Sequence, residues 1–217
     1  MFILAFDTAT PAVTVAAHDG SDVVACESAV DARRHGELLA PAIATVLSKA
    51  GAQPGDVTAI AVGTGPGPYT GLRVGLVTAR VLGSALGVPV DGVCTLDIIA
   101  VAARRAAGGG EFIVATDARR REVYWARYAA SGERMSQPQV SLPALVPAGL
   151  PVAGEGPVLH AALGAAGVIE PRYPSAADLA QIAAGHLAAG VAPGPADALY
   201  LRRPDAREPG RPKRVTP

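Results

Sequence analysis

The sequence predicts an α/β protein with two related lobes, the second smaller than the first. Three apolar runs rich in β-branched residues open the chain, and helix and strand patterns then alternate as far as residue 107. After the glycine joint Gly108-Gly109-Gly110, two further strand patterns begin a second copy of the same design. With 217 residues, half of them hydrophobic, the chain is long enough to bury a substantial core.

The opening strands are expected at residues 2–6, 12–17 and 23–30. Asp19-Gly20 predicts a hairpin turn between the second and third of them. Because consecutive strands joined by short turns pair side by side, we expect an antiparallel meander. A helix follows over residues 36–50, and Gly51 is suited to end it. Its apolar stripe consists of Leu38, Leu39, Ala42, Ile43, Val46 and Leu47.

The centre of the chain is a strand, a stiff turn and a helix. The strand is expected at residues 57–62, the turn at 63–71 and the helix at 72–86. The turn does not fit a phosphate-binding loop well. No lysine follows Gly71, and Thr70 stands where a dinucleotide-binding fingerprint has its last glycine.

The central helix carries small residues at intervals of four, which form one nearly bare ridge. The ridge consists of Gly71, Gly75, Ala79, Gly83 and Gly87. Glycine inside a helix costs about 1 kcal/mol relative to alanine, so the ridge needs a reason. Either another protein approaches it closely, or it packs against this chain's own sheet or a neighbouring helix. The sequence leaves both alternatives open.

The remaining elements are expected as follows. A strand spans residues 88–93, and Thr95 caps a helix that runs to about residue 107. Beyond the joint we expect strands at 112–116 and 122–129, an irregular stretch at 131–151, a short strand at 152–154, and alanine-rich helices at 158–166 and 175–189, the last capped by Ser175. The expected domains are residues 1–108 and 109–202, followed by a basic, proline-rich and disordered tail at 203–217.

Composition excludes several classes of protein. The formal net charge is zero and aromatic residues make up only 4%, which argues against a broad base-stacking nucleic-acid surface. The four histidines lack metal-ligand spacing, and no serine stands in a Gly-x-Ser-x-Gly elbow. Cys26 and Cys94 form no CxxC pair, and no apolar run is long enough to span a membrane. We therefore expect a cytoplasmic protein with no membrane partner and without metal or cofactor.

Two carboxylates each end an apolar strand. Asp7 and Asp117 are placed where carboxylates often hold a metal–phosphate group, but equally where they cap a turn. The residues themselves favour the turn and leave the alternative open.

Taken together, the motifs resemble the TsaB (YeaZ) family. They are Asp7-Thr8-Ala9-Thr10, Arg34-His35, Leu38-Leu39-x-Pro41, Gly65-Pro66-Gly67-Pro68-Tyr69-Thr70-Gly71-Leu72-Arg73-Val74-Gly75, Asp117-Ala118-Arg119 with Glu122-Val123-Tyr124, and Tyr200-Leu201-Arg202. The resemblance is firm over residues 1–130 and thin over 131–199. Pro68 and Tyr69 replace the serine and phenylalanine usual in the family, and both preserve the turn and the ring.

The resemblance implies an actin-like ATPase fold of the sugar kinase/Hsp70 and RNase H-like type, with a reduced second lobe. It implies a non-catalytic scaffold that binds and activates TsaD, the transferase that makes N6-threonylcarbamoyladenosine in tRNA. TsaE joins that complex, and tRNA is touched only indirectly or through the tail. Asp7, Thr8 and Thr10 are weak candidates for a nucleotide site, since Ala9 replaces the family fold's phosphate-loop glycine.

The implied docking surface is the helix pair 36–50 and 71–87, which a homodimer could also use. Its expected residues are Leu38, Leu39, Ala42, Ile43, Val46, Gly71, Leu72, Arg73, Gly75, Leu76, Ala79 and Gly83. The alternative function is an actin-fold enzyme in its own right, either an ATP-dependent small-molecule kinase or a peptidase-like hydrolase.

Overall fold

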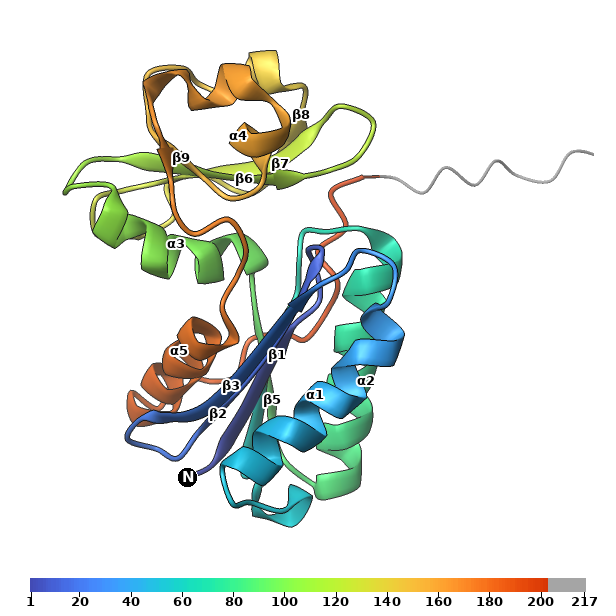
Figure 1. Cartoon of the computed structure of the whole chain (residues 1–217). Coiled ribbons are helices and arrows are strands. Elements are labelled where there is room, and N and C mark those ends of the chain that lie inside the picture. The colour runs from blue at the N-terminus through green and yellow to red at the C-terminus, as the bar shows by residue number, and fades with distance from the viewer. Residues whose placement is uncertain (203–217) are drawn as a thin grey trace, which may run out of the picture.

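The computed structural model describes residues 1–202 and has two lobes, each built on a five-stranded sheet. Figure 1 shows the first lobe below and the second above. The first sheet has the order β3-β2-β1-β4-β5, with β2 antiparallel to β1 and with β4 and β5 parallel to it. Its strands are β1 (Ile3–Asp7), β2 (Ala12–His18), β3 (Val23–Val30), β4 (Ala59–Gly63) and β5 (Val90–Val93). The opening meander is as predicted.

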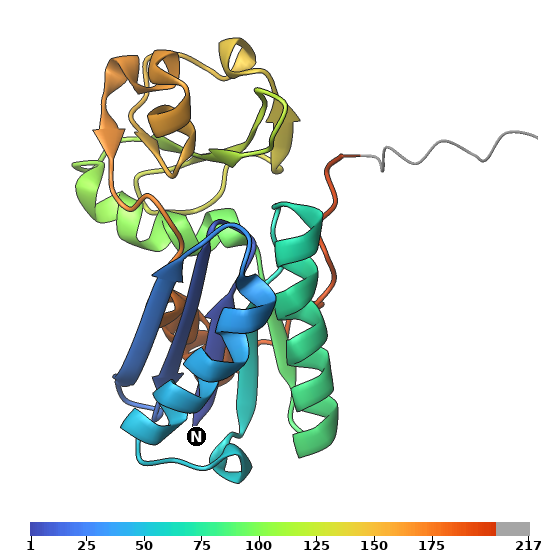
Figure 2. The same cartoon turned by 45° about the vertical axis from the view of Figure 1, so that its right-hand side comes forward.

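Helices cover both faces of the first sheet (Figures 1 and 2). On one face lie α1 (His35–Lys49) and α2 (Tyr69–Leu86), side by side, and on the other lies α5 (Ala176–Ala188). Strand β1 is buried on both sides because its side chains alternate. Leu4 and Phe6 pack toward α1 and α2, while Ile3 and Ala5 pack toward α5.

The second sheet repeats the first in reduced form, with the order β10-β9-β6-β7-β8. Its strands are β6 (Phe112–Asp117), β7 (Val123–Tyr128), β8 (Gln139–Ser141), β9 (Val152–Ala153) and β10 (Val168–Ile169). The pairing is the same as in the first sheet: β7 is antiparallel to β6, and β9 and β10 are parallel to it. Two strands of only two residues each make this copy small. The expected α/β fold of two related lobes, with a reduced second lobe, is therefore confirmed.

Helix α3 (Thr95–Ala106) connects the two lobes (Figure 1). Its Ile98 side chain packs in the core of the first lobe, against residues such as Val93 and Leu179. Its Leu96 and Ile99 side chains pack on the second sheet. One amphipathic helix thus contributes to two cores.

The C-terminal half departs from expectation in two places. The alanine-rich helix α5, expected within the second lobe, packs on the first sheet, because Ala176, Leu179, Ala180 and Ala183 form an apolar face fitted to β1 and β2. The helix expected at 158–166 is broken into α4 (Gly156–Leu159) and a 3-10 turn. Ser175 does cap α5, accepting a hydrogen bond from the Ala177 N–H at 3.2 Å. The tail predicted at 203–217 lies outside the described residues.

After α5, residues 191–202 return along the edge of β5 and the side of α2; we call this segment the C-terminal strap. The Gly92 N–H donates to the Gly194 carbonyl at 3.0 Å, and the Leu199 N–H donates to the Thr64 carbonyl at 2.9 Å. The strap therefore covers part of the exposed edge of the first sheet. Within residues 1–202, no helix has both the length and the apolarity needed to span a bilayer.

Candidate functional site

The turn after β1 is a hydrogen-bonded junction between three elements. Asp7 is fully buried; its Oδ1 accepts from the Ala9 N–H at 2.7 Å and its Oδ2 from the Thr95 hydroxyl at 2.6 Å. The Thr95 hydroxyl in turn accepts from the Gly65 N–H at 3.1 Å. Both carboxylate oxygens of Asp7 are therefore engaged by the chain itself. Thr95 was expected to cap α3, but the N-cap is Cys94, which has extended backbone angles, and the Thr95 hydroxyl bonds to Asp7.

Burial raises the pKa of Asp7 above its ordinary value. The hydrogen bonds from Thr95 and Ala9 oppose this shift, as does the nearby His35, but burial is the largest effect. Thr10 shares the junction through its carbonyl oxygen, which lies 2.7 Å from His35 Nε2. A carbonyl can only accept, so this ring nitrogen carries the hydrogen.

Thr8 joins the same turn to the small-residue ridge of α2. Its hydroxyl donates to the Gly71 carbonyl at 2.7 Å and accepts from the Gly75 N–H at 3.0 Å. A Cβ at Gly75 would lie 2.6 Å from that hydroxyl oxygen, and a Cβ at Gly83 would lie 2.4 Å from Val90. From Gly71 to Gly83 the ridge therefore packs against this chain's own first turn and sheet, whereas Gly87 is exposed and caps the end of α2.

Much of the docking surface predicted from the sequence lies inside the folded chain. Nine of the expected residues are buried within the chain: Leu39, Ile43, Val46, Gly71, Leu72, Gly75, Leu76, Ala79 and Gly83. Leu38 and Ala42 are half-buried, and only Arg73 is exposed. Of the two alternatives for the ridge, packing within the chain is the right one. Residues four apart lie on one face of the helix, and that face meets the sheet.

The same helix pair also carries exposed apolar residues. Val77 and Val81 are 56% and 60% exposed on α2, one turn apart, and Ala40 and Ala44 are exposed on α1. We call these four residues the outer helix face. The arginines of α2 lie beside the strap instead: Arg80 donates to the Ala196 carbonyl at 2.7 Å.

A pocket of about 540 Å³ lies where the two lobes face each other; we call it the interlobe pocket. Its walls come from the turn before α2, the β6–β7 turn and the end of the strap. The lining residues are Gly67, Pro68, Tyr69, Ala118, Arg119, Arg120, Tyr124, Tyr200, Leu201 and Arg202. A smaller hollow of about 210 Å³ shares Pro68 and Arg119 with it and reaches Thr8, Thr10 and His35.

The β6–β7 turn holds an unusual backbone. Arg119, Arg120 and Arg121 have φ angles of 61°, 54° and 63°, a left-handed conformation that non-glycine residues rarely adopt. Such strained segments concentrate at functional sites. The Asp117 carboxylate accepts from the Arg119 N–H at 2.8 Å, so Asp117 caps this turn as the residues favoured.

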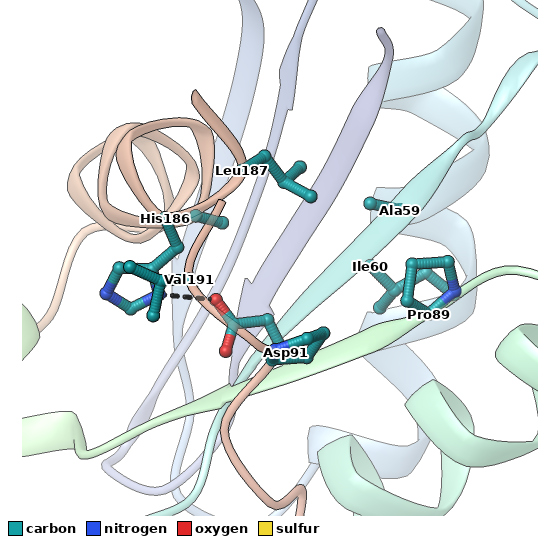
Figure 3. A pocket seen from close by; sticks show the side chains of 9 residues that line it. Ala59, Ile60, Pro89, Asp91, His186, Leu187 and Val191 are labelled. Atoms are coloured by element: carbon teal, nitrogen blue, oxygen red, sulfur yellow. Dashed lines mark hydrogen bonds and ion pairs between the residues drawn. The ribbon is translucent and has the colours of Figure 1, made fainter. Parts of the chain in front are cut away.

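A further hollow is much smaller than these two. The hollow between α5 and β5 has room for about one water molecule at most (about 10 Å³), and its polar feature is the pair formed by His186 Nδ1 and Asp91 Oδ2 at 2.8 Å (Figure 3). Within residues 1–202, no group of three or more His, Cys, Asp or Glu side chains could hold a metal ion.

Two surfaces were not predicted from the sequence: the outer helix face and the interlobe pocket. The outer helix face was overlooked because the glycine ridge on the opposite side gave the stronger pattern. A signal was present, since Val77 and Val81 lie four residues apart, about one helical turn. The interlobe pocket joins Tyr69, Tyr124 and Tyr200, which are far apart in the chain, and only the lobe arrangement brings them together.

Comparison with known proteins gives consistent matches. The family model described as "TsaD: tRNA N6-adenosine threonylcarbamoyltransferase" matches residues 27–166. An Escherichia coli protein called "tRNA threonylcarbamoyladenosine biosynthesis protein TsaB" is 40% identical over 129 residues, which are 59% of this chain and 55% of that protein. An uncharacterized protein of Mycobacterium leprae is 46% identical over 209 residues, 94% of this chain and 56% of the relative. The chain thus spans about half the length of both curated relatives.

A solved structure matches over nearly the whole chain. YeaZ from Pseudomonas aeruginosa superposes with a TM-score of 0.77 and 32% sequence identity, covering 92% of this chain and 99% of that one. The fold, the motifs and these matches agree: the chain belongs to the TsaB (YeaZ) family, within the broader family that the TsaD model describes.

Proposed function

We propose that this protein is a non-catalytic subunit of the machinery that makes N6-threonylcarbamoyladenosine in tRNA. In this proposal it binds and activates TsaD, the threonylcarbamoyl transferase, and TsaE joins the two. The name of the E. coli relative and the family model supply the pathway. The observation that carries the proposed role is the outer helix face, an exposed apolar surface on two adjacent helices.

The outer helix face suits a helical partner. Single exposed valines are ordinary, but Val77 and Val81 lie one turn apart on α2, and the exposed alanines of α1 add no charge. Burying each valine against a partner would contribute on the order of 1–2 kcal/mol. A second copy of this chain could use the same face when TsaD is absent, which would give a symmetric dimer.

The first turn supports a role without catalysis. In an actin-like enzyme this position faces nucleotide phosphates, but here the carboxylate of Asp7 is bound to Ala9 and Thr95. The hydroxyl of Thr8 is likewise committed to the backbone of α2. The kinase and hydrolase alternatives would need these groups free to reach a substrate.

The proposal is tested by light scattering of the chain mixed with TsaD of the same organism. The double variant Val77→Glu/Val81→Glu places two charges on the outer helix face and should abolish the complex, because buried unpaired charges are costly. Val158→Glu is the matched control, since Val158 is 53% exposed but lies on α4 of the second lobe.

The wild type and the Val158→Glu control should form the same heteromeric complex. Circular dichroism should show that all three proteins are equally folded. A complex of undiminished mass and affinity with the Val77→Glu/Val81→Glu variant would remove the outer helix face from the interface and contradict the proposal.

A further inference from the structure

The outermost strand of the first sheet has an open edge. Strand β3 (Val23–Val30) ends the order of that sheet and pairs with β2 alone among the strands of residues 1–202. It forms the margin of the sheet on the side away from α2 (Figure 2). Open edges are commonly blunted by proline or by several charges, but β3 contains no proline and one charged residue, Glu27. Such an edge can pair with another strand.

The ladder between β2 and β3 shows which backbone groups face the open edge. The Asp31 N–H donates to the Pro11 carbonyl at 2.9 Å, at the end of a register that is regular over residues 25–30. In an antiparallel ladder, alternate residues direct both N–H and C=O toward the paired strand. The odd-numbered residues of this stretch therefore bond to β2. The even-numbered residues, Cys26, Ser28 and Val30, direct their N–H and C=O groups to the open edge.

The side chains along this edge are uncovered as well. Cys26, Ser28 and Val30 are all exposed, and Val30 is 59% exposed although it is apolar. On the face toward α1, a hollow of about 170 Å³ lies beside the same strand. Its lining residues are Val13, Glu27, Ser28, Ala29, Leu38, Pro41, Ala42 and Thr45. Both the backbone and the apolar surface of this edge are thus available to a partner.

The charges of the strand suit pairing with a second copy of itself. A two-fold axis through Ser28 places Cys26 opposite Val30 and Glu27 opposite Ala29, so every outward-facing residue meets another outward-facing residue. An axis through Glu27 would set two carboxylates opposite each other, which is destabilising. Glu27 is also ion-paired with Lys49 of its own chain. Since the formal net charge of the chain is zero, two copies do not repel each other.

We propose that two copies of this chain associate through β3, antiparallel about a two-fold axis at Ser28. The two first-lobe sheets then continue into each other, and the contact is the same on both subunits. This interface shares no residue with the outer helix face. The proposal does not rest on the proposed function, and one chain could hold a second copy and the partner protein at the same time.

The first test is light scattering of the full chain across a concentration series, where the wild type should reach the mass of a dimer. Ser28→Pro removes an N–H that faces the open edge and breaks no bond to β2, so it should give a folded monomer. Ser28→Lys keeps the N–H but sets two like charges on the axis, and should also give a monomer. Ser28→Thr is the matched control; it keeps the N–H, favours a strand and should remain a dimer. Circular dichroism checks that all are folded.

The second test fixes the register with dibromobimane, a short crosslinker of thiols. In Cys26→Ser/Ser28→Cys the new thiols meet on the axis and should be joined into a covalent dimer. In the wild type, Cys26 lies opposite Val30 of the second copy, so the two Cys26 thiols are too far apart to be joined. Burial raises the pKa of the other thiol, Cys94, to about 12, so it stays protonated and unreactive.

The proposal is overturned if the wild type stays monomeric throughout the series, or if Ser28→Pro and Ser28→Lys both remain dimers. Crosslinking of the wild type in place of Cys26→Ser/Ser28→Cys would contradict the register. A dimer that Val77→Glu/Val81→Glu abolishes and Ser28→Lys preserves would assign self-association to the outer helix face instead. Ser28→Lys should still form the complex with TsaD, so failure of this proposal is distinguished from failure of the proposed function.

Discussion

Asp7 carries a carboxylate, a group common in catalysis, but both of its oxygens are hydrogen-bonded within the chain. The sequence places it at the end of a buried strand, where either a metal–phosphate group or a turn could use it. Which of the two applies depends on Thr95, which is 88 residues away and donates its hydroxyl hydrogen to Asp7 at 2.6 Å. No local pattern reveals such a partner, so the sequence alone left both alternatives open.

The raised pKa of Asp7 gives a pH-dependent prediction with a definite sign. The native state binds this proton more tightly than the unfolded chain, whose carboxyl has a pKa of about 4. The contribution of Asp7 to stability is therefore fully present below that value and is lost as the pH rises through the native pKa. Asp7→Asn is nearly isosteric and lacks this titration.

Urea unfolding of both proteins at pH 4 and pH 7 measures the effect. Relative to Asp7→Asn, the wild type should lose free energy of unfolding as the pH rises. A wild type that gains stability over the variant between these pH values would show that the native pKa is lowered, and would contradict the assignment of Asp7 as a desolvated structural group.

At the level of elements, the sequence predicted the strands and helices of the first lobe well because their periodic patterns are long and clear. It predicted that α2 has a bare ridge but could not say what lies against it. The structure places Thr8 and the sheet there, so only the opposite side of α2 is open to a partner. The buried part of the predicted docking surface came from interpreting close approach as approach by another protein, whereas the first turn of the same chain packs against the ridge.

Substitution within the ridge should therefore damage folding and not merely binding. Gly75→Leu forces a side chain into the 2.6 Å gap beside the Thr8 hydroxyl and should lower the free energy of unfolding by about 3 kcal/mol or more. Val77→Leu, two residues along the same helix but 56% exposed, should change it by less than about 0.5 kcal/mol. Thermal and urea unfolding distinguish the two, and equal stability of both variants would contradict internal packing of the ridge.

At the level of the whole molecule, the sequence predicted a reduced second copy from its first two strands, and the second sheet repeats the pairing of the first. It could not show that α5 and the strap return to the first lobe. Alanine-rich helices fit many surfaces, and which sheet receives α5 is decided by long-range packing against β1 and β2. The interlobe pocket depends on this return, because the strap brings Tyr200 beside Tyr69.

The central claim is that this chain activates its partner by docking and supplies no catalytic group. The most direct measurement is the yield of N6-threonylcarbamoyladenosine in tRNA when TsaD and the other components are supplied with wild type, Asp7→Asn or Val77→Glu/Val81→Glu. The account predicts wild-type yield with Asp7→Asn and a yield near that of TsaD alone with the double variant. Loss of the product with Asp7→Asn while its complex with TsaD stays intact would place a catalytic group in this chain and contradict the account.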